Sequence, residues 1–213
     1  QVFGVISSWW LSLHLFAIGG LLSAISAVTQ MLAVTWSTSP APSKLIANIQ
    51  RWVLVFGAIS ISLGREMKNV KIFEFGAGLV FVSMFILIYI LIVVRSQAQT
   101  KRFCPVIEAY IAGIITGTIG IFIGVLLGRG YVSYRPYELR EVHIILNLYG
   151  LIGLIIAGTL PFFVATQVRS KMSKRATPKV MRTIFFILFV ATLISALGFF
   201  FGNNYIAASG LIL

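Results

Sequence analysis

The sequence lacks aspartate, and its only acidic residues are five glutamates. It has one cysteine, Cys104, and two histidines, His14 and His143. A single cysteine excludes an intrachain disulfide, a cysteine zinc site and an iron–sulfur cluster. Charged residues make up only 10% of the chain, against about 25% in a soluble domain. Together these shortages exclude a water-soluble enzyme, a disordered chain and a disulfide-stabilised secreted scaffold.

Apolar residues are abundant instead. They account for 59% of the 213 residues, and the mean hydropathy is +0.99. Because a membrane-spanning helix needs about 20 mostly apolar residues, we expect an all-α integral membrane protein, with a bundle of six transmembrane helices forming one polytopic domain over residues 1–213. The expected spans are approximately residues 8–36, 45–63, 72–94, 106–127, 141–166 and 184–201. The apolar tail, residues 206–213, is too short to cross alone.

Lysine and arginine residues are distributed unevenly between alternate loops. The loops after the first, third and fifth spans hold 11 of them, and the loops after the second and fourth hold 6. The positive-inside rule therefore places both termini outside and residues 169–182 in the cytoplasm of a multi-pass plasma-membrane protein. These charges also attract anionic membrane lipid. Because they flank spans rather than form a free patch, we expect no nucleic-acid partner.

The two histidines lie at similar expected depths in two different spans. His14 comes six residues after the expected start of the first span, and His143 comes near the start of the fifth. An ionisable side chain inside a span indicates a functional site. Two neutral imidazoles from separate helices can hold one haem iron between them. The sequence therefore predicts a haem b site near the outer face, with His14 and His143 as metal ligands.

Other residues fit the surroundings of such a site. Asn147 and Gly150 follow His143 at helical spacing and share its face. The fourth span carries a row of small residues that permits close helix contact: Gly120, Gly124 and Gly128. Haem propionates favour cationic donors, and the arginines near the expected outer helix ends are Arg65, Arg129, Arg135 and Arg140. Of these, Arg140, one turn before His143, and Arg65 complete the predicted cofactor site.

The segment from Glu141 to Pro161 resembles the His-x-His helix of haem–copper oxidase catalytic subunits, most closely the C-type oxidases. It matches the pattern H-x-H-x-N-x-x-G at His143, Asn147 and Gly150. Residues 9–20, which contain His14, are similar to the helix of that family that carries the low-spin haem histidine. The resemblance implies a shortened relative that keeps one haem, held by the two histidines.

The chain departs from the family pattern in two ways. Ile145 stands where the second histidine of the motif is expected, so the resemblance leaves open whether a low-spin haem site is kept. The oxidases also use three more histidines to hold copper, and this chain has no further histidine. Counting ligands therefore excludes an oxygen-reducing haem–copper centre.

We expect a non-catalytic electron-transfer subunit of a respiratory or related redox complex. Two histidine ligands saturate the iron, which favours electron transfer over oxygen chemistry. Its redox partner would be quinol, an external copper protein or a cytochrome. Three alternatives stay open: a transition metal held by both histidines with Glu141 or Glu74, a cofactor-free accessory subunit with structural histidines, and a small transporter. The transporter is disfavoured because the two halves show no repeat.

Overall fold

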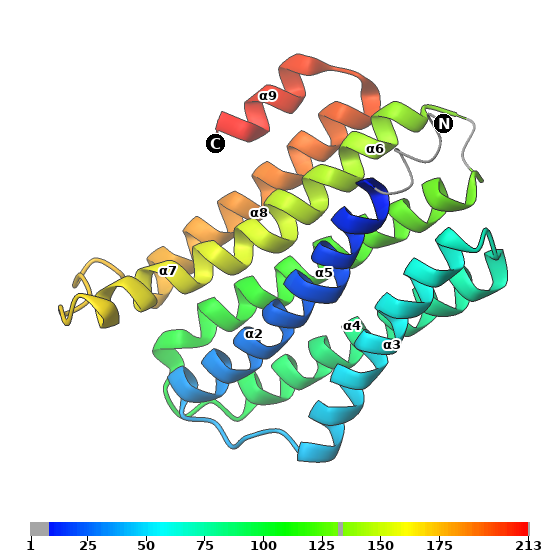
Figure 1. Ribbon diagram of the computed structural model, residues 1–213. Coiled ribbons are helices and arrows are strands. Elements are labelled where there is room, and N and C mark those ends of the chain that lie inside the picture. Colours follow the sequence, from blue (N-terminus) through cyan, green and yellow to red (C-terminus); the bar gives the residue numbers. More distant parts are fainter. Residues whose placement is uncertain (1–8, 132–133, 213) are drawn as a thin grey trace. The chain divides into compact units, whose positions relative to one another are not determined.

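The computed structural model describes residues 9–131 and 134–212, and every regular element in those ranges is helical (Figure 1). The elements in chain order are η1 (Leu15–Leu21), α2 (Leu22–Ser37), α3 (Lys44–Glu66), α4 (Val70–Ser96), η2 (Lys101–Phe103), α5 (Cys104–Arg129), α6 (Pro136–Ile145), η3 (Leu146–Gly153), α7 (Leu154–Gln167), α8 (Pro178–Phe201) and α9 (Asn204–Ile212).

Six stretches of helix are long and apolar enough to cross a membrane. They are Trp9–Ser37, Lys44–Glu66, Val70–Ser96, Lys101–Arg129, Pro136–Gln167 and Pro178–Phe201. The prediction of an all-α, six-span membrane protein is confirmed. Contact with membrane lipid follows from these spans.

The helices extend beyond most of the expected limits because they continue into polar residues at their ends. The fifth span begins at Pro136, five residues before the expected start, and Pro136 occupies the first helical turn, where the missing proline N–H costs nothing. The second span continues past residue 63 and includes Arg65 in its last turn, where a cation stabilises the helix dipole. Ser8, the expected start of the first span, lies outside the described residues.

The apolar tail forms a short helix, α9, that folds back against α8 (Figure 1). Gly202 ends α8 in the left-handed conformation, with φ of 67°, which glycine adopts without strain. The side-chain oxygen of Asn203 then accepts hydrogen bonds from the N–H groups of Tyr205 and Ile206, each at 3.1 Å. Ser195 Oγ donates to the carbonyl of Ala207 at 3.1 Å. The tail is thereby held as a helical hairpin rather than as a seventh span.

The helices form two compact units. The first comprises the described residues up to Leu32 together with Ala41–Val93, and the second comprises Ala33–Pro40 and the described residues from Val94 onward. The second unit contains α5, α6, η3, α7, α8 and α9. Its packing centres on α5, which contacts α6, η3, α7 and α8.

A fully buried glutamine links three helices of the first unit. Gln50 of α3 has no exposed surface. Its Oε1 accepts hydrogen bonds from Ser26 Oγ at 2.7 Å and from Gln30 Nε2 at 3.2 Å, both on α2. Its Nε2 donates to Ser83 Oγ of α4 at 2.9 Å. Gln50 is one of the polar residues in the least apolar of the six spans. Its hydrogen bonds join that span to α2 and α4.

Replacement of Gln50 by alanine is expected to destabilise the protein by about 2 kcal/mol, because several interhelical hydrogen bonds worth about 0.6–2 kcal/mol each in a membrane would be lost. Asn48→Ala is the matched control, because Asn48 is exposed and accepts a hydrogen bond from Arg51 on its own helix. Unfolding by sodium dodecyl sulfate in mixed micelles measures both variants. Equal stability of Gln50→Ala and Asn48→Ala would refute this role.

Candidate functional site

His143 lies on α6 and faces α5. Its side chain is partly buried, and its Nδ1 lies 2.6 Å from the main-chain carbonyl oxygen of Gly120. A carbonyl oxygen only accepts hydrogen bonds, so Nδ1 carries the proton in this contact. The neutral ring therefore has its lone pair on Nε2, the nitrogen that would bind a metal ion.

A row of glycines on α5 provides the space for the His143 side chain and its helix. A Cβ atom added at Gly124 would lie 2.5 Å from His143 Cε1, and one added at Gly117 would lie 2.9 Å from Leu151 Cβ. A Cβ atom added at Gly120 would lie equally close to Asn147 Nδ2. The predicted small-residue row thus meets the histidine-bearing helix and extends further toward Gly117 than the sequence analysis proposed.

Asn147 and Gly150 share the face of His143, as their spacing predicts. Asn147 Nδ2 donates to the carbonyl oxygen of His143 at 2.8 Å. Gly150 is buried, and a Cβ added there would lie 2.8 Å from Thr116 Cβ on α5. Both residues therefore contribute to the packing between this helix and α5.

His14 belongs to the first unit and makes a comparable main-chain contact. Its Nδ1 lies 2.9 Å from the carbonyl oxygen of Trp10, one turn earlier. The imidazole also stacks on the Trp10 indole, with ring centroids 4.1 Å apart and planes inclined by 17°. The guanidinium of Arg65 lies over the same indole, 5.2 Å from its centroid. The Trp10 carbonyl again requires the proton on Nδ1, which places the lone pair on Nε2.

A π-helical segment follows each histidine. η1 begins at the residue after His14, and its wider turn is closed by the bond from the N–H of Leu22 to the carbonyl of Ala17. η3 begins three residues after His143. π-helical turns are rare in proteins, but those that occur are often found at functional sites. Sequence periodicity did not predict them.

The predicted propionate donors differ in their surroundings. Arg140 is exposed, and its Nη2 lies 3.3 Å from Glu141 Oε1. Arg135 Nη1 donates to the carbonyl of Phe200 at 2.9 Å, at the C-terminal end of α8. The guanidinium of Arg129 lies over the Tyr131 ring, 4.3 Å from its centroid. Arg135 therefore caps α8, whereas Arg140 presents its charge at the surface.

Within the described part of the chain, no group of three His, Cys, Asp or Glu side chains is placed to hold a metal ion. This gives no support to the alternative metal site with a glutamate ligand. Each imidazole taken by itself has the donor chemistry of a haem-iron ligand.

Glu108 of α5 binds two arginines in an ionic cluster that the sequence patterns did not predict. Arg95 Nε lies 3.0 Å from Glu108 Oε1, and Arg182 Nε lies 2.7 Å from Glu108 Oε2. Arg182 is 74 residues away along the chain, so no local pattern reveals the contact. The only available signal was the position of these residues near helix ends on the more basic side.

Comparison of the whole chain with protein-family models, with curated proteins and with solved structures finds no match. The resemblance of residues 141–161 and 9–20 to haem–copper oxidases therefore stays a prediction.

Proposed function

We propose that the chain is a haem-b-binding membrane subunit that carries electrons, with His14 and His143 as the axial ligands of one haem. One observation supports this proposal. Each histidine makes its own contact of the same kind, in which Nδ1 lies within hydrogen-bond distance of a main-chain carbonyl oxygen. That bond fixes the ring orientation and the Nε2 lone pair, as is usual for metal-binding histidines.

The surrounding residues suit this role. The carbonyls of Trp10 and Gly120 orient the two imidazoles, and Arg65 and Arg140 would supply cationic donors for the propionates. The surrounding apolar helices would exclude water from such a site. When bound, the haem supplies one-electron redox chemistry, and two histidine ligands leave the iron no open position for oxygen. Joint ligation requires the two histidine-bearing helices to face each other.

The proposal includes a larger redox complex in the plasma membrane as the setting. Electrons would be exchanged with quinol, an external copper protein or a cytochrome. Any enzymatic activity would belong to the complex rather than to this subunit.

We further infer that both termini lie outside, from the excess of basic residues in alternate loops. In a Cys104→Ser background, Lys68→Cys should react with a membrane-impermeant maleimide in intact cells. Lys171→Cys should react only after permeabilisation, because its loop is expected in the cytoplasm. Both lysines are exposed, so accessibility within the protein is matched. The opposite labelling pattern would show that both termini lie on the cytoplasmic side and would contradict the proposed topology.

The alternative is a cofactor-free accessory subunit of a larger membrane complex. The observation that favours it is that His143 fits its surroundings as a packing residue, with Gly120 as hydrogen-bond partner and Gly124 beneath its ring. The haem content of the detergent-purified protein, expressed in a haem-sufficient host, separates the two proposals. We expect one haem per chain, and folded protein without haem would favour the accessory role.

A further inference from the structure

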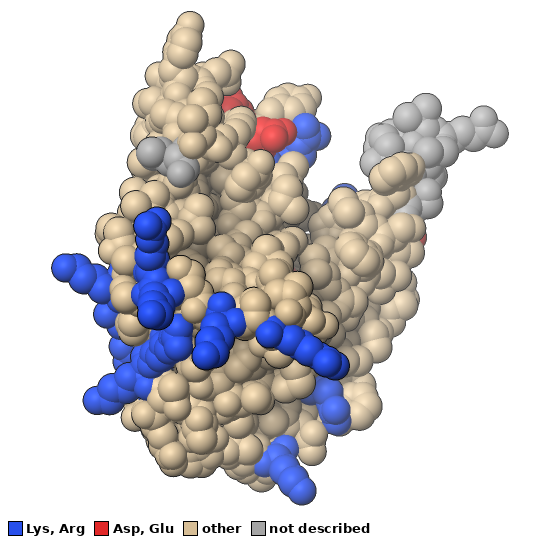
Figure 2. All heavy atoms as spheres, turned by 90° about the vertical axis from the view of Figure 1, so that its left-hand side faces the viewer, with Lys and Arg blue, Asp and Glu red and all other residues tan. Residues whose placement is uncertain are grey.

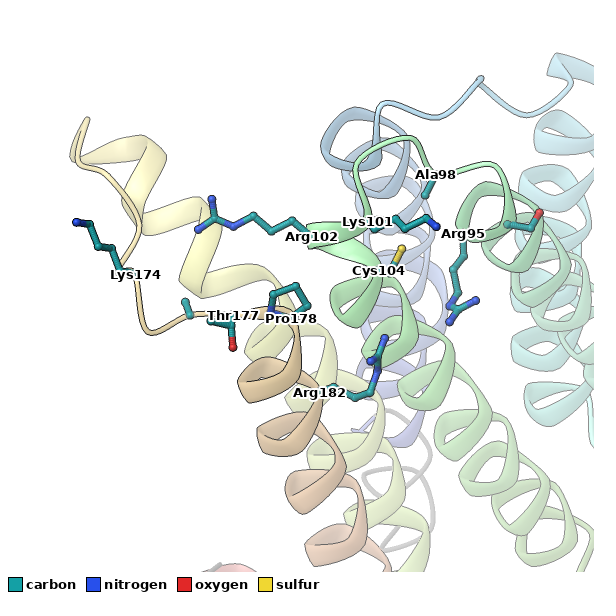
Figure 3. A pocket seen from close by; sticks show the side chains of 11 residues that line it. Arg95, Ala98, Lys101, Arg102, Cys104, Lys174, Thr177, Pro178 and Arg182 are labelled. Carbon is teal, nitrogen blue, oxygen red and sulfur yellow. The ribbon is translucent and has the colours of Figure 1, made fainter.

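A pocket of about 720 Å³ lies in the second unit, where α4 ends and where α5 and α8 begin (Figure 3). Its volume is within the usual range of small-molecule sites. The lining comes from the end of α4, from η2 and the start of α5, and from the segment that leads into α8. Residues far apart in the sequence therefore form one hollow at the ends of three spans.

Five cationic side chains line this pocket: Arg95, Lys101, Arg102, Lys174 and Arg182. Figure 3 shows Arg102 extending from η2 toward the segment that carries Lys174, and Arg182 rising toward Cys104. Glu108 is the carboxylate that faces this cluster, and it pairs with Arg95 and Arg182. Among the described residues, Lys101, Arg102 and Lys174 have no acidic partner. The pocket therefore keeps a large excess of positive charge.

The same hollow receives the N-terminal ends of two long helices. α5 begins at Cys104 and α8 at Pro178, and both residues line the pocket. The N-terminal ends of helices carry partial positive charge. The N–H of Cys104 is already bonded to the carbonyl of Lys101, the N–H of Val180 to Thr177 Oγ1, and Pro178 has no N–H. The contribution of these helix ends is therefore their partial charge. These two helix ends add to the attraction that the side chains exert on an anion.

The position of the pocket restricts its ligand. Lys and Arg side chains gather on the face of the molecule that Figure 2 shows. The pocket lies where α4 ends and α5 and α8 begin, and lipid headgroups lie at the ends of spans. Basic pockets between transmembrane helices bind anionic headgroups. Arginine guanidinium groups match phosphate oxygens in a two-pronged arrangement.

We propose that this pocket binds a phosphate group, either in the headgroup of an anionic phospholipid or in a soluble phosphate. The site is separate from the histidines and does not depend on haem binding. Arg95 and Arg182 are held by Glu108 and line the phosphate site. Lys101, Arg102 and Lys174 also line it and supply the unpaired charge.

The test measures the thermal unfolding midpoint of the detergent-purified full chain during titration with dioctanoyl phosphatidylglycerol or with inorganic phosphate, against sodium chloride at equal ionic strength. Lys101→Gln/Arg102→Gln removes two pocket charges without touching the Glu108 pairs. Lys171→Gln/Arg175→Gln removes two exposed charges from the same basic side that do not line the pocket.

We expect a saturable rise in the midpoint for the wild type, with half-saturation weakened about 30-fold in the pocket variant and changed less than about 3-fold in the control. Saturation by phosphatidylglycerol alone identifies a lipid headgroup, and saturation by inorganic phosphate identifies a soluble source. Equal weakening in both variants would show diffuse surface attraction and overturn the proposal. Failure of both phosphate compounds to stabilise the wild type beyond sodium chloride would overturn it too.

Discussion

Replacement of His143 by alanine is expected to abolish haem binding, with the haem content of the purified protein falling at least tenfold. The variant lacks the Nε2 ligand, and the Gly120 carbonyl loses the group that it orients. Free imidazole at millimolar concentration should restore part of the haem signal, because it can occupy the space left by the side chain. Haem content and visible absorption measure both effects.

Leu148→Ala is the control for this experiment, because Leu148 lies on η3 and its side chain is 51% exposed. It should retain the haem of the wild type. His14→Ala should behave like His143→Ala, since the proposal assigns one axial position to each histidine. An unchanged haem content in both histidine variants would rule out these residues as the ligands.

Replacement of Gly124 by alanine is the second change with a large expected effect. The added Cβ would lie 2.5 Å from Cε1 and 2.7 Å from Nδ1 of His143, so the ring must move away from α5. Movement would break the hydrogen bond to Gly120, and the loss of such an orienting contact typically lowers metal affinity 10–100-fold. Overpacking should also destabilise the protein by about 1–3 kcal/mol.

Gly78→Ala is the matched control, because a Cβ added there meets nothing within 4 Å and Gly78 also lies inside a long apolar helix, α4. Haem titration and detergent unfolding measure the two consequences separately. If Gly124→Ala kept both the haem affinity and the stability of Gly78→Ala, the close contact between His143 and α5 would have no role in the site.

The six spans could be predicted from the sequence because apolar length alone decides whether a helix can cross a membrane. The helical spacing of His143, Asn147 and Gly150 likewise placed them on one face. The small residues Gly120 and Gly124 indicated close helix contact, and the structure shows the histidine-bearing helix against them.

The remaining features depend on contacts between distant parts of the chain. In the sequence, Gln50 only lowers the hydropathy of its span. Its role becomes clear when the structure shows its hydrogen-bond partners Ser26 and Ser83. The sequence places Glu108 near a helix end, which is typical of an interfacial carboxylate. The structure adds its ion pair with Arg182. The π-helical turns after the histidines shift the side-chain register in a way that 3.6-residue periodicity does not describe. Local sequence patterns carry none of this information.

The most direct test of the central claim is the dithionite-reduced minus oxidised visible spectrum of the detergent-purified protein from a haem-sufficient host. The account predicts a sharp α-band and a shifted Soret band, the signature of a low-spin b-type haem with two nitrogen ligands. It also predicts that carbon monoxide leaves the reduced spectrum unchanged, because both axial positions are occupied. A flat difference spectrum from folded protein would contradict the account and leave His14 and His143 as packing residues.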